Sequence, residues 1–455
     1  MKSIYERYHI AVKDAPPKIK LPPKFLVNRY NNCTNAQECT QACIYGVHEV
    51  TEDGQIAEPV QDLCRGCYMC VLKCPKSAIS IGINSEFEEL GNSYFSPDRI
   101  KTIYFEAETG RVPVSGAGYT GPFTGEGFDS IWFDFSEIVR PTRDGIHGRE
   151  FISTSVDLGR RLQFLKFDEN AELVSIVPKT VEIPIPIILD PPLGCRTSRN
   201  LQSAVAKAAA ELKTFAIVNA REYSSDLANY KTNLIPRISS DEIDEFEELV
   251  KTSQIVEVEL KDDDIKNHLE KIKATNSSAL VSFHFPYDKE APERADAIAR
   301  IGGDIVHFDV DDGVVERDPD VIKNAIRSVN SYLVDKRDRD KITLISSGGI
   351  AEAAHVPKSI ILGANAVAVG TAYQIALGCK VCHGNMHSQD CPISLEDEDV
   401  ELATQRITNL ISAWRDQLLE VLGGMGLREV RRQTGELGRA MFYEDLEAKV
   451  FGDKE

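Results

Sequence analysis

Eight apolar runs recur between residues 183 and 372, and amphipathic stretches of helical periodicity lie between most of them. The runs are IPIPIILD (183–190), TFAIVNA (214–220), LIPRIS (234–239), IVEVELK (255–261), ALVSFHF (279–285), DIVHFDV (304–310), KITLISSGG (341–349) and NAVAVGTA (365–372). Such alternation is typical of parallel strands joined by crossover helices. Eight units predict an α/β fold with a closed (β/α)8 (TIM) barrel, and a doubly wound open sheet is the alternative.

The remainder of the chain divides by composition. Residues 1–30 carry Pro and Lys and are expected to form an N-terminal arm. Residues 31–95 hold a first group of cysteines and predict a small α+β domain, and residues 96–180 mix short β-like runs with Gly- and Pro-rich turns before the barrel. We expect the barrel and a cysteine-bearing loop over residues 181–393, and C-terminal helices packed on the barrel over residues 394–455.

The overall composition excludes several classes of protein. With 455 residues, 42% hydrophobic and 27% charged, the chain is globular and can bury a large core. Its net charge of −19 has no basic stripe to offset it, so we expect neither a nucleic-acid nor an anionic-membrane partner. We find no apolar run long enough for a membrane span and no signal-peptide core at the start, which favours a cytoplasmic location.

Ten of the eleven cysteines fall into two tight groups, and Cys195 stands alone. The first group is Cys33, Cys39, Cys43, Cys64, Cys67, Cys70 and Cys74, and the second is Cys379, Cys382 and Cys391. A secreted protein would spread disulfide-forming cysteines over a small domain, whereas most of this chain has none. Reduced thiolates that bind metal are therefore the better interpretation.

The second half of the first group has the spacing of bacterial ferredoxins. Cys64, Cys67, Cys70 and Cys74-Pro75 spell C-x2-C-x2-C-x3-C-P, a run whose fourth cysteine ligates a second cluster. A zinc site is the alternative, but zinc sites seldom use a third cysteine at this spacing. We therefore predict iron–sulfur clusters.

The first half of the group keeps the same register but has Ala36 where a ligand is expected. Pairing across the two runs gives one complete site for a [4Fe-4S] cluster, formed by Cys43, Cys64, Cys67 and Cys70. It leaves a site with three thiolates, from Cys33, Cys39 and Cys74. Three thiolates suit a [3Fe-4S] cluster or a [4Fe-4S] cluster with a non-cysteine ligand, and an empty site is the alternative.

Glycine-containing loops follow the seventh and eighth predicted strands. They are Ser346-Ser347-Gly348-Gly349 and Gly370-Thr371. Phosphate commonly binds these two loops of such barrels, because glycines let backbone N–H groups approach its oxygens. The G-x-G-x-x-G string at residues 116–121 is not a dinucleotide fingerprint, since Pro122 and further glycines follow where a helix must begin. Because the sequence shows no other nicotinamide-binding signature, electrons are expected to arrive through clusters or from a separate subunit.

The segment 344–393, LISSGGIAEAAHVPKSIILGANAVAVGTAYQIALGCKVCHGNMHSQDCPI, closely resembles the FMN-domain signature of glutamate synthases. The resemblance implies that Ser347, Gly348, Gly349, Gly370 and Thr371 hold the FMN phosphate. It also implies that Cys379, Cys382 and Cys391 bind a [3Fe-4S] or further [4Fe-4S] cluster beside the flavin. The pre-barrel stretch FDSIWFDFSEIVRP and the C-terminal helix match as well, and a ferredoxin-like domain ahead of the barrel is the archaeal-type arrangement.

The chain also departs from the family. Its last cysteines are spaced C-x2-C-x8-C in place of C-x5-C-x4-C, so His383 or His387 is a candidate fourth ligand. The family's lysines on strands four and five are replaced by Glu259 and His284, and its Gly-Gly-Thr-Gly loop after strand six by residues 312–317, DGVVER. A cation near the flavin stabilises its reduced form, so a protonated His284 would partly compensate, and His284 is the candidate catalytic residue. A satisfied core histidine is the alternative.

Three functions are compatible with these features. The resemblance implies an FMN- and iron–sulfur-dependent oxidoreductase that reduces the imine of 2-oxoglutarate to glutamate. The altered positions allow a non-catalytic electron-transfer subunit, or a flavoenzyme for another substrate. We expect a redox partner subunit or ferredoxin, and separate amidotransferase and NAD(P)H-oxidising subunits, because Met1-Lys2 offers no cysteine nucleophile. Membership of a complex or homo-oligomer is expected.

Overall fold

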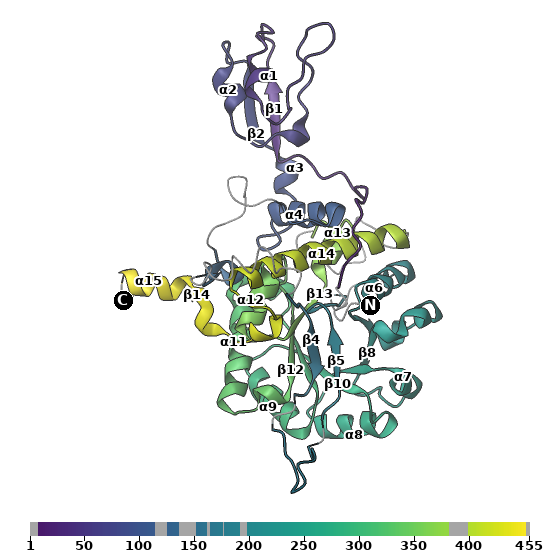
Figure 1. The fold of residues 1–455 in the computed structure, drawn as a ribbon. Coiled ribbons are helices and arrows are strands. Elements are labelled where there is room, and N and C mark those ends of the chain that lie inside the picture. The colour runs from purple at the N-terminus through teal and green to yellow at the C-terminus, as the bar shows by residue number, and fades with distance from the viewer. Residues whose placement is uncertain are drawn as a thin grey trace, which may run out of the picture.

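The structure, a computed structural model, describes residues 8–113, 125–135, 152–161, 164–175, 177–191, 198–381 and 399–451. A barrel forms the main body, a layer of two long helices covers one end of it, and a small cysteine-bearing unit stands beyond that layer (Figure 1). None of the described helices combines the length and the apolar character that crossing a membrane requires.

The eight predicted strands close into one parallel barrel, which confirms the predicted fold class and excludes the open sheet. They are β6 (Ile187–Leu189), β7 (Ala216–Asn219), β8 (Leu234–Ser239), β9 (Ile255–Glu259), β10 (Leu280–Pro286), β11 (Ile305–Asp309), β12 (Thr343–Ser347) and β13 (Ala366–Val369). The barrel closes where β13 pairs with β6. Most side chains on both faces of the strands are buried, so the strands appear as nearly continuous apolar runs.

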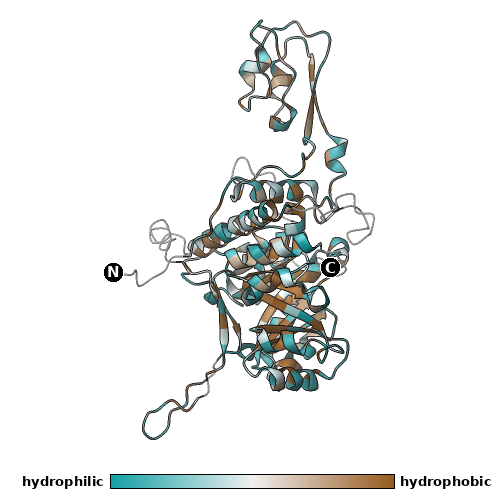
Figure 2. Cartoon of the chain, turned by 90° about the vertical axis from the view of Figure 1, so that its right-hand side faces the viewer, coloured by the Kyte–Doolittle hydropathy of each residue, from teal (hydrophilic) through white to brown (hydrophobic). Residues whose placement is uncertain are grey.

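Helices surround the barrel, with apolar strands inside them (Figure 2). They are α6 (Arg199–Glu211), α7 (Glu247–Thr252), α8 (Ile265–Thr275), α9 (Ala291–Ile301), α10 (Asp312–Arg317), α11 (Asp320–Asp335), α12 (His355–Leu362) and α13 (Thr371–Ala376). Short 3-10 turns, η4 (Ala220–Glu222), η5 (Ser225–Asn233) and η6 (Arg339–Lys341), complete the connections. The Ser198 side chain caps α6 by accepting from the Leu201 N–H, which fixes where that helix begins.

Two helices from distant parts of the sequence form the layer over the strand ends. These are α4 (Pro97–Thr109) and α14 (Val400–Gly424), which pack against each other and against α13 and α6. The segment expected to form C-terminal helices contains α14, and the described tail beyond it is mostly non-helical. It contains the turns η7 (Val430–Arg432) and η8 (Leu437–Arg439) and the strand β14 (Ala440–Phe442) before α15 (Tyr443–Phe451). Gly426 and Gly435 adopt positive φ and interrupt the helix that periodicity predicts.

Beyond α4, the described residues of the pre-barrel segment form short strands and a 3-10 turn. After η2 (Gly127–Ser130), β3 (Ile131–Phe133) pairs with β14, and β4 (Val156–Gly159) pairs antiparallel with β5 (Thr180–Ile183). The backbone of Gly159 exchanges hydrogen bonds with the Thr343 hydroxyl at the start of β12. The β4–β5 pair therefore covers the end of the barrel opposite to the glycine loops.

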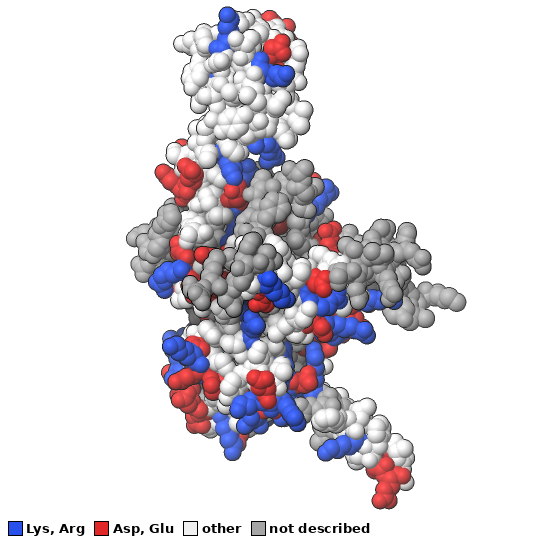
Figure 3. Space-filling view, turned by 90° about the vertical axis from the view of Figure 1, so that its left-hand side faces the viewer, with Lys and Arg blue, Asp and Glu red and all other residues white. Residues whose placement is uncertain are grey.

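The cysteine-bearing unit is built from two similar halves. Strands β1 (Phe25–Arg29) and β2 (Ile79–Ile83) pair antiparallel, and α1 (Glu38–Ala42), η1 (Gln61–Leu63) and α2 (Met69–Lys73) lie between them, before α3 (Ser85–Glu88). Asn35 and Gln37 before α1 have φ of 56° and 61°, and Gly66 and Tyr68 before α2 have φ of 65° and 61°. The two cysteine runs therefore share one backbone path. The visible face of this unit carries fewer charges than the barrel (Figure 3).

Candidate functional site

A cavity opens at the C-terminal ends of the barrel strands, where the sequence analysis placed the phosphate loops. The empty space within it measures about 630 Å³ when the open mouth is included. Polar lining comes from Asp190, His284, Asp309, Asp311, Asp312, Ser347 and Thr371, and further lining from Phe95, Pro191, Val310, Gly348, Gly349, Ile350, Ala368 and Gly370. All five predicted phosphate-loop residues and His284 thus meet at one cavity.

The loop after β12 needs glycine at two successive positions. Gly348 and Gly349 have φ of 81° and 63°, a region that other residues rarely adopt. A Cβ on Gly348 would lie 1.7 Å from the Val310 carbonyl oxygen, and one on Gly349 would lie 3.0 Å from Val315. The loop therefore presents bare backbone to the cavity, which is what a phosphate cradle requires.

A carboxylate already binds the donors of this cradle. The Gly349 N–H donates to Asp312 Oδ1 over 2.9 Å, and the Thr371 hydroxyl donates to Asp312 Oδ2 over 2.5 Å. Asp312 belongs to α10, the element that replaces the glycine loop expected after the sixth strand. The donor set fits an anion, and the anion that binds it in the structure belongs to the chain itself.

Beneath the cavity, the barrel interior contains a buried ion-pair network. Arg237 on β8 pairs with Asp190 at 2.8 Å and with Glu257 on β9 at 2.7 Å, and all three side chains are at least nine-tenths buried. The Ser282 hydroxyl donates to Glu257 over 3.0 Å. Because Arg237 has two carboxylate partners, its positive charge is compensated within the barrel. It therefore offers no unpaired cation to a ligand in the cavity.

A chain of hydrogen bonds runs from this network to the cavity wall. His307 on β11 contacts Glu257 Oε2 through Nδ1 and the Ser347 hydroxyl through Nε2, each over 2.9 Å. Ser347 in turn donates to Asp309 Oδ1 over 3.0 Å. Asp309 ends β11 and faces the cavity, so the relay connects the barrel core with a carboxyl group beside the cradle.

Asp309 is poised to titrate near neutrality. The pKa of this carboxyl is raised to about 6, chiefly by burial; His307 and Ser347 oppose the shift, and Asp190 and Asp312 contribute to it. A carboxyl with such a pKa at a cavity wall can hold or release a proton at physiological pH. The sequence analysis missed Asp309, although its position at the end of an apolar run was a usable signal.

His284 lies on β10 and is almost fully buried. Its ring packs edge to face against His307 with centroids 4.8 Å apart, and its Nδ1 has no hydrogen-bond partner within the described residues. Burial, then the charge of Arg237, holds the pKa of His284 well below its usual range. The protonated His284 that would replace a family lysine is therefore disfavoured, and a neutral imidazole faces the cavity.

The other two departures also take definite positions. Glu259 at the end of β9 pairs with Lys261 and does not line the cavity. Residues 312–317 form α10 in place of a glycine loop. Glu259, which replaces one of the family's lysines, therefore adds no negative charge to the cavity wall. The α10 segment, which replaces the glycine loop, adds the Asp312 carboxylate to it.

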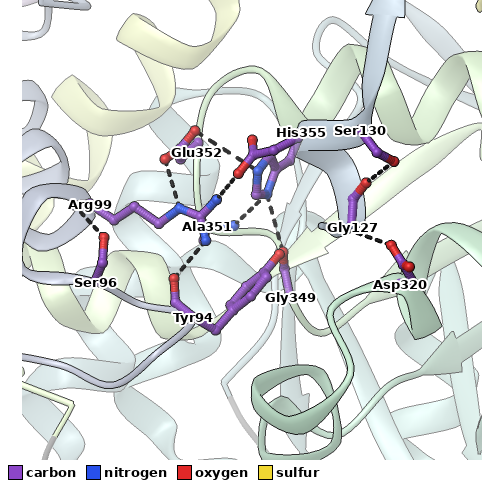
Figure 4. A network of polar contacts seen from close by, with 11 residues as sticks. Tyr94, Ser96, Arg99, Gly127, Ser130, Asp320, Gly349, Ala351, Glu352 and His355 are labelled. Atoms are coloured by element: carbon purple, nitrogen blue, oxygen red, sulfur yellow. Dashed lines mark hydrogen bonds and ion pairs between the residues drawn. The ribbon is translucent and has the colours of Figure 1, made fainter. Parts of the chain in front are cut away.

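A second polar network lies behind the cradle and ties it to the segment before α4 (Figure 4). Arg99 donates to Glu352 over 2.7 Å, to Asp129 over 2.6 Å and to the Tyr94 carbonyl oxygen over 2.6 Å. The Tyr94 hydroxyl donates to the Gly349 carbonyl oxygen over 2.5 Å. The segment before α4 therefore helps to fix the conformation of the cradle.

Asp129, Glu352 and His355 have the spacing of metal ligands, but the network argues against a metal there. The guanidinium of Arg99 already lies between the two carboxylates. His355 Nδ1 already lies 3.1 Å from the Ala351 nitrogen and 3.2 Å from the Gly349 carbonyl oxygen, so backbone contacts occupy this ring nitrogen.

The structure gathers the N-terminal cysteines into two groups. Electrostatic contacts connect Cys70 with Cys43, Cys64 and Cys67, and burial raises the pKa of the Cys70 thiol to about 11. The other contacts connect Cys39 with Cys33 and Cys74. The grouping follows the pairing across runs that the spacing predicts. A four-thiol set is suited to an iron–sulfur cluster, because cluster iron compensates the repulsion between thiolates.

A buried histidine lines a small cavity beside the four-thiol group. His48 is 4% exposed, and neither ring nitrogen has a hydrogen-bond partner within the described residues. Four cysteines, Cys43, Cys64, Cys67 and Cys70, line the same cavity. An orphaned imidazole among four thiols fits a site built for a further group, and the sequence analysis did not single it out.

The C-terminal cysteine loop is described only in part. Cys379 follows α13, and its sulfur accepts from the Val381 N–H over 3.5 Å. The neighbouring Lys380 carbonyl oxygen accepts from the Gly91 N–H over 2.9 Å, which joins this loop to the connection from the cysteine-bearing unit. Cys382, Cys391, His383 and His387 lie outside the described residues.

Comparison with known proteins agrees with this arrangement. The conserved region of glutamate synthase matches residues 257–428. An archaeal-type glutamate synthase (NADPH) of Dehalococcoides mccartyi is 27% identical, over 92% of this chain and 95% of the relative. An archaeal glutamate synthase (NADPH) of Archaeoglobus fulgidus is 25% identical, over 95% and 97%. The solved flavin-binding domain of baker's yeast flavocytochrome b2 has a TM-score of 0.44 at 12% identity, over 81% of this chain and 84% of that one.

The fold, the site and these comparisons together define an oxidoreductase barrel with an anion-binding end and an added cysteine-rich unit. Within that class, the chain is similar to the archaeal-type glutamate synthases along nearly its whole length. The family resemblance and the enzyme class predicted from the sequence are thereby confirmed.

Proposed function

We propose that the chain is an FMN- and iron–sulfur-dependent oxidoreductase of the glutamate synthase type, which forms glutamate by reducing the imine derived from 2-oxoglutarate. One observation carries the proposal: a single chain, similar to glutamate synthases over more than nine-tenths of its length, combines a strand-end cradle with a cysteine, Cys379, just beyond the helix that begins at the cradle. Thr371 of the cradle begins α13, and Cys379 follows the end of α13. The flavin site and a cluster site would therefore be neighbours.

Bound FMN would supply hydride transfer to the substrate. Ser347, Gly348 and Gly349 on one side and Gly370 and Thr371 on the other would hold its phosphate. The chain's own contribution to the chemistry is proton management. Asp309 can hold a proton near pH 6, and the relay through Ser347 and His307 connects it with the barrel core. The neutral imidazole of His284 is available to orient a polar substrate group.

Electrons would enter through the cysteine-bearing unit, as a ferredoxin-like domain. Its exposed side chains include Ile44 and Leu72, which are 85% and 76% exposed beside Cys43 and Cys74. An apolar surface next to a cluster favours docking of a separate donor, either a ferredoxin or an NAD(P)H-oxidising subunit. We further infer a separate amidotransferase as the ammonia source and, from the clustered reduced thiols, a cytoplasmic location.

One observation favours a second candidate, an electron-transfer subunit or a flavoenzyme with another substrate. Four aspartates, Asp190, Asp309, Asp311 and Asp312, line the cavity, and its described lining contains neither lysine nor arginine. Such a wall repels the two carboxylates of 2-oxoglutarate unless another element supplies cations. The comparisons do not favour this candidate.

The test is an anaerobic preparation in which flavin, iron and sulfide are counted per chain, followed by an assay of glutamate formation. Chemically reduced viologen would supply electrons, and ammonium would replace the amidotransferase. Glutamate formed from 2-oxoglutarate supports the first proposal. Bound flavin and iron without glutamate formation, at any ammonium concentration, favours the second. A colourless protein lacking both overturns the two together.

A further inference from the structure

Asp312 satisfies two donors that come from two different loops of the barrel. The Gly349 N–H lies after β12, and the Thr371 hydroxyl lies after β13, yet both donate to the same carboxylate. These are the two loops between which barrels of this class bind phosphate. Carboxylate and phosphate oxygens compete for the same kind of donor. Asp312 therefore stands where a phosphate oxygen would otherwise accept these hydrogen bonds.

The segment that carries Asp312 is held in place by its own contacts. Asp311 caps α10 by accepting from the N–H groups of Gly313 and Val314, over 2.9 and 3.2 Å. Val315 is fully buried, and it lies so close to Gly349 that a Cβ on that glycine would come within 3.0 Å of it. The carboxylate is thus presented to the cradle by a folded element and not by a loose loop.

A phosphate and the Asp312 carboxylate cannot both use these donors. A dianion in the cradle would lie beside the Asp312 carboxylate within a wall that also carries Asp309 and Asp311. Like charges a few ångströms apart repel strongly where burial limits solvent screening. Binding of a phosphate must therefore displace the carboxylate of Asp312, which is the first residue of α10.

We propose that Asp312 is an internal competitor for the phosphate subsite, so that a flavin phosphate enters only when the segment Asp311–Arg317 moves away. The proposal rests on the proposed function, because it takes the ligand to be FMN. It assigns to Asp312 the role of a specificity-determining residue, which lowers the affinity for FMN without contacting the ring system. A flavin without a phosphate would bind without displacing it.

The test compares FMN with riboflavin on protein from which flavin has been removed anaerobically. Quenching of flavin fluorescence would give dissociation constants for wild type, Asp312→Ala, Asp312→Asn and, as a matched control, Asp311→Asn. Alanine frees both donors, and asparagine removes the charge together with one of the two acceptor oxygens. Asp311→Asn also removes one negative charge from the cavity wall, but the Gly349 and Thr371 donors stay bonded to Asp312. We expect Asp312→Ala to tighten FMN on the order of tenfold relative to riboflavin, and Asp311→Asn to shift that ratio far less.

Hydrogen exchange gives a second readout. The amides of Gly313 and Val314, protected by Asp311, should exchange faster in wild type when FMN is added, and should not respond to riboflavin. An unchanged or weakened FMN affinity in both Asp312 variants would overturn the proposal, as would equal effects of Asp311→Asn and Asp312→Asn. If FMN and riboflavin both fail to bind every variant, the proposed function fails with it. FMN binding that Asp312 does not influence refutes only the present inference.

Discussion

The indole N–H of Trp414 donates a hydrogen bond to the carboxyl group of Glu106 over 2.9 Å, and both side chains are essentially inaccessible to solvent. The bond joins α14 to α4 in the layer above the strand ends. Burial raises the pKa of Glu106 to about 8, and the bond from Trp414 only partly opposes this shift. The group is therefore protonated in the folded protein at neutral pH.

Glu106→Gln should make the protein more resistant to alkaline conditions. An acid whose pKa rises from 4.5 to about 8 on folding stabilises the fold fully below pH 4.5, and this stabilisation is lost as the pH rises to 8. Glutamine keeps an acceptor for Trp414 and cannot ionise. We expect the free energy of unfolding of the variant to exceed that of wild type by about 3 to 5 kcal/mol more at pH 9 than at pH 4.5.

Urea unfolding across this pH range would measure the difference. Glu88→Gln, at an exposed position on α3, is the control and should change nothing. Trp414→Phe removes the hydrogen bond that favours the ionised form of Glu106. The free energy of unfolding of this variant should therefore depend on pH more steeply than that of wild type. A Glu106→Gln curve parallel to that of wild type would show that Glu106 is ionised in the folded protein.

Arg99 should be sensitive even to a conservative change. It binds Asp129, Glu352 and the Tyr94 carbonyl oxygen in a largely buried position. Removing one partner of a buried ion pair leaves uncompensated charge, so Arg99→Leu should destabilise the protein by about 3 to 5 kcal/mol. Arg99→Lys retains the charge but loses the fork geometry, and should cost less.

Thermal unfolding and flavin affinity together would test this role. Because Tyr94 also bonds to Gly349, Arg99→Lys should weaken flavin binding more than its loss of stability explains. Tyr94→Phe, which removes only the bond to Gly349, is the matched variant for the cradle effect. Unchanged flavin affinity in both would mean that the network supports the fold alone.

The barrel was predictable because of how its strands are buried. A strand covered on both faces gives a continuous apolar run, and eight such runs lie between 183 and 372. The non-helical tail was not predictable from periodicity, because β14 forms by pairing with β3 across some three hundred residues of sequence. The grouping of the N-terminal cysteines could be predicted, because each run of ligands is short and has the spacing of ferredoxins.

The polar network was not predicted because its members lie within the apolar runs themselves. Each member is a single polar residue within an apolar run: Arg237 in LIPRIS, Glu257 in IVEVELK and His307 in DIVHFDV. That they meet inside the barrel depends on strand order and register. The sequence likewise reveals the lost glycine loop. It does not reveal that α10 aims Asp312 at donors from two other loops, because this depends on tertiary distance.

The affinity for phosphate-bearing ligands should depend on pH through Asp309. Its pKa of about 6 means that the wall gains a negative charge as the pH rises from 5 to 7. Affinity for FMN should therefore fall over this interval, whereas affinity for riboflavin should change little. Asp309→Asn should weaken the dependence and match wild type at low pH, and the remainder comes from the second ionisation of the FMN phosphate, which has a pKa of about 6. Equal pH dependence for the two flavins, measured by fluorescence titration, would contradict this role.

Substitution of single cysteines can test the pairing across runs. Cys43 contacts the group of Cys64, Cys67 and Cys70, although Cys74 is the one that adjoins these three in sequence. Cys43→Ser should therefore abolish the paramagnetic signal of the four-thiol cluster and lower iron and sulfide per chain. Cys74→Ser should leave that signal in place and affect only the three-thiol site. The reverse result would show that each run ligates its own cluster.

His48 should tune the reduction potential of the four-thiol cluster. Burial, then the charge of Arg29, lowers the pKa of His48, so the neutral ring offers one N–H donor inside the cavity that the four cysteines line. A hydrogen bond to cluster or cysteine sulfur stabilises the reduced, more negative state. His48→Leu should therefore make the potential more negative at unchanged iron content, and His48→Asn, which restores an N–H, should recover part of the shift.

A redox titration followed by paramagnetic resonance would separate this effect from simple loss of packing. Tyr45→Phe, in the same cavity wall, is the matched control and should leave the potential unchanged. Leucine and asparagine differ little in size but differ in the donor, so a packing effect would shift both His48 variants alike. Equal potentials for the two variants would therefore remove His48 from the set of residues that tune the cluster.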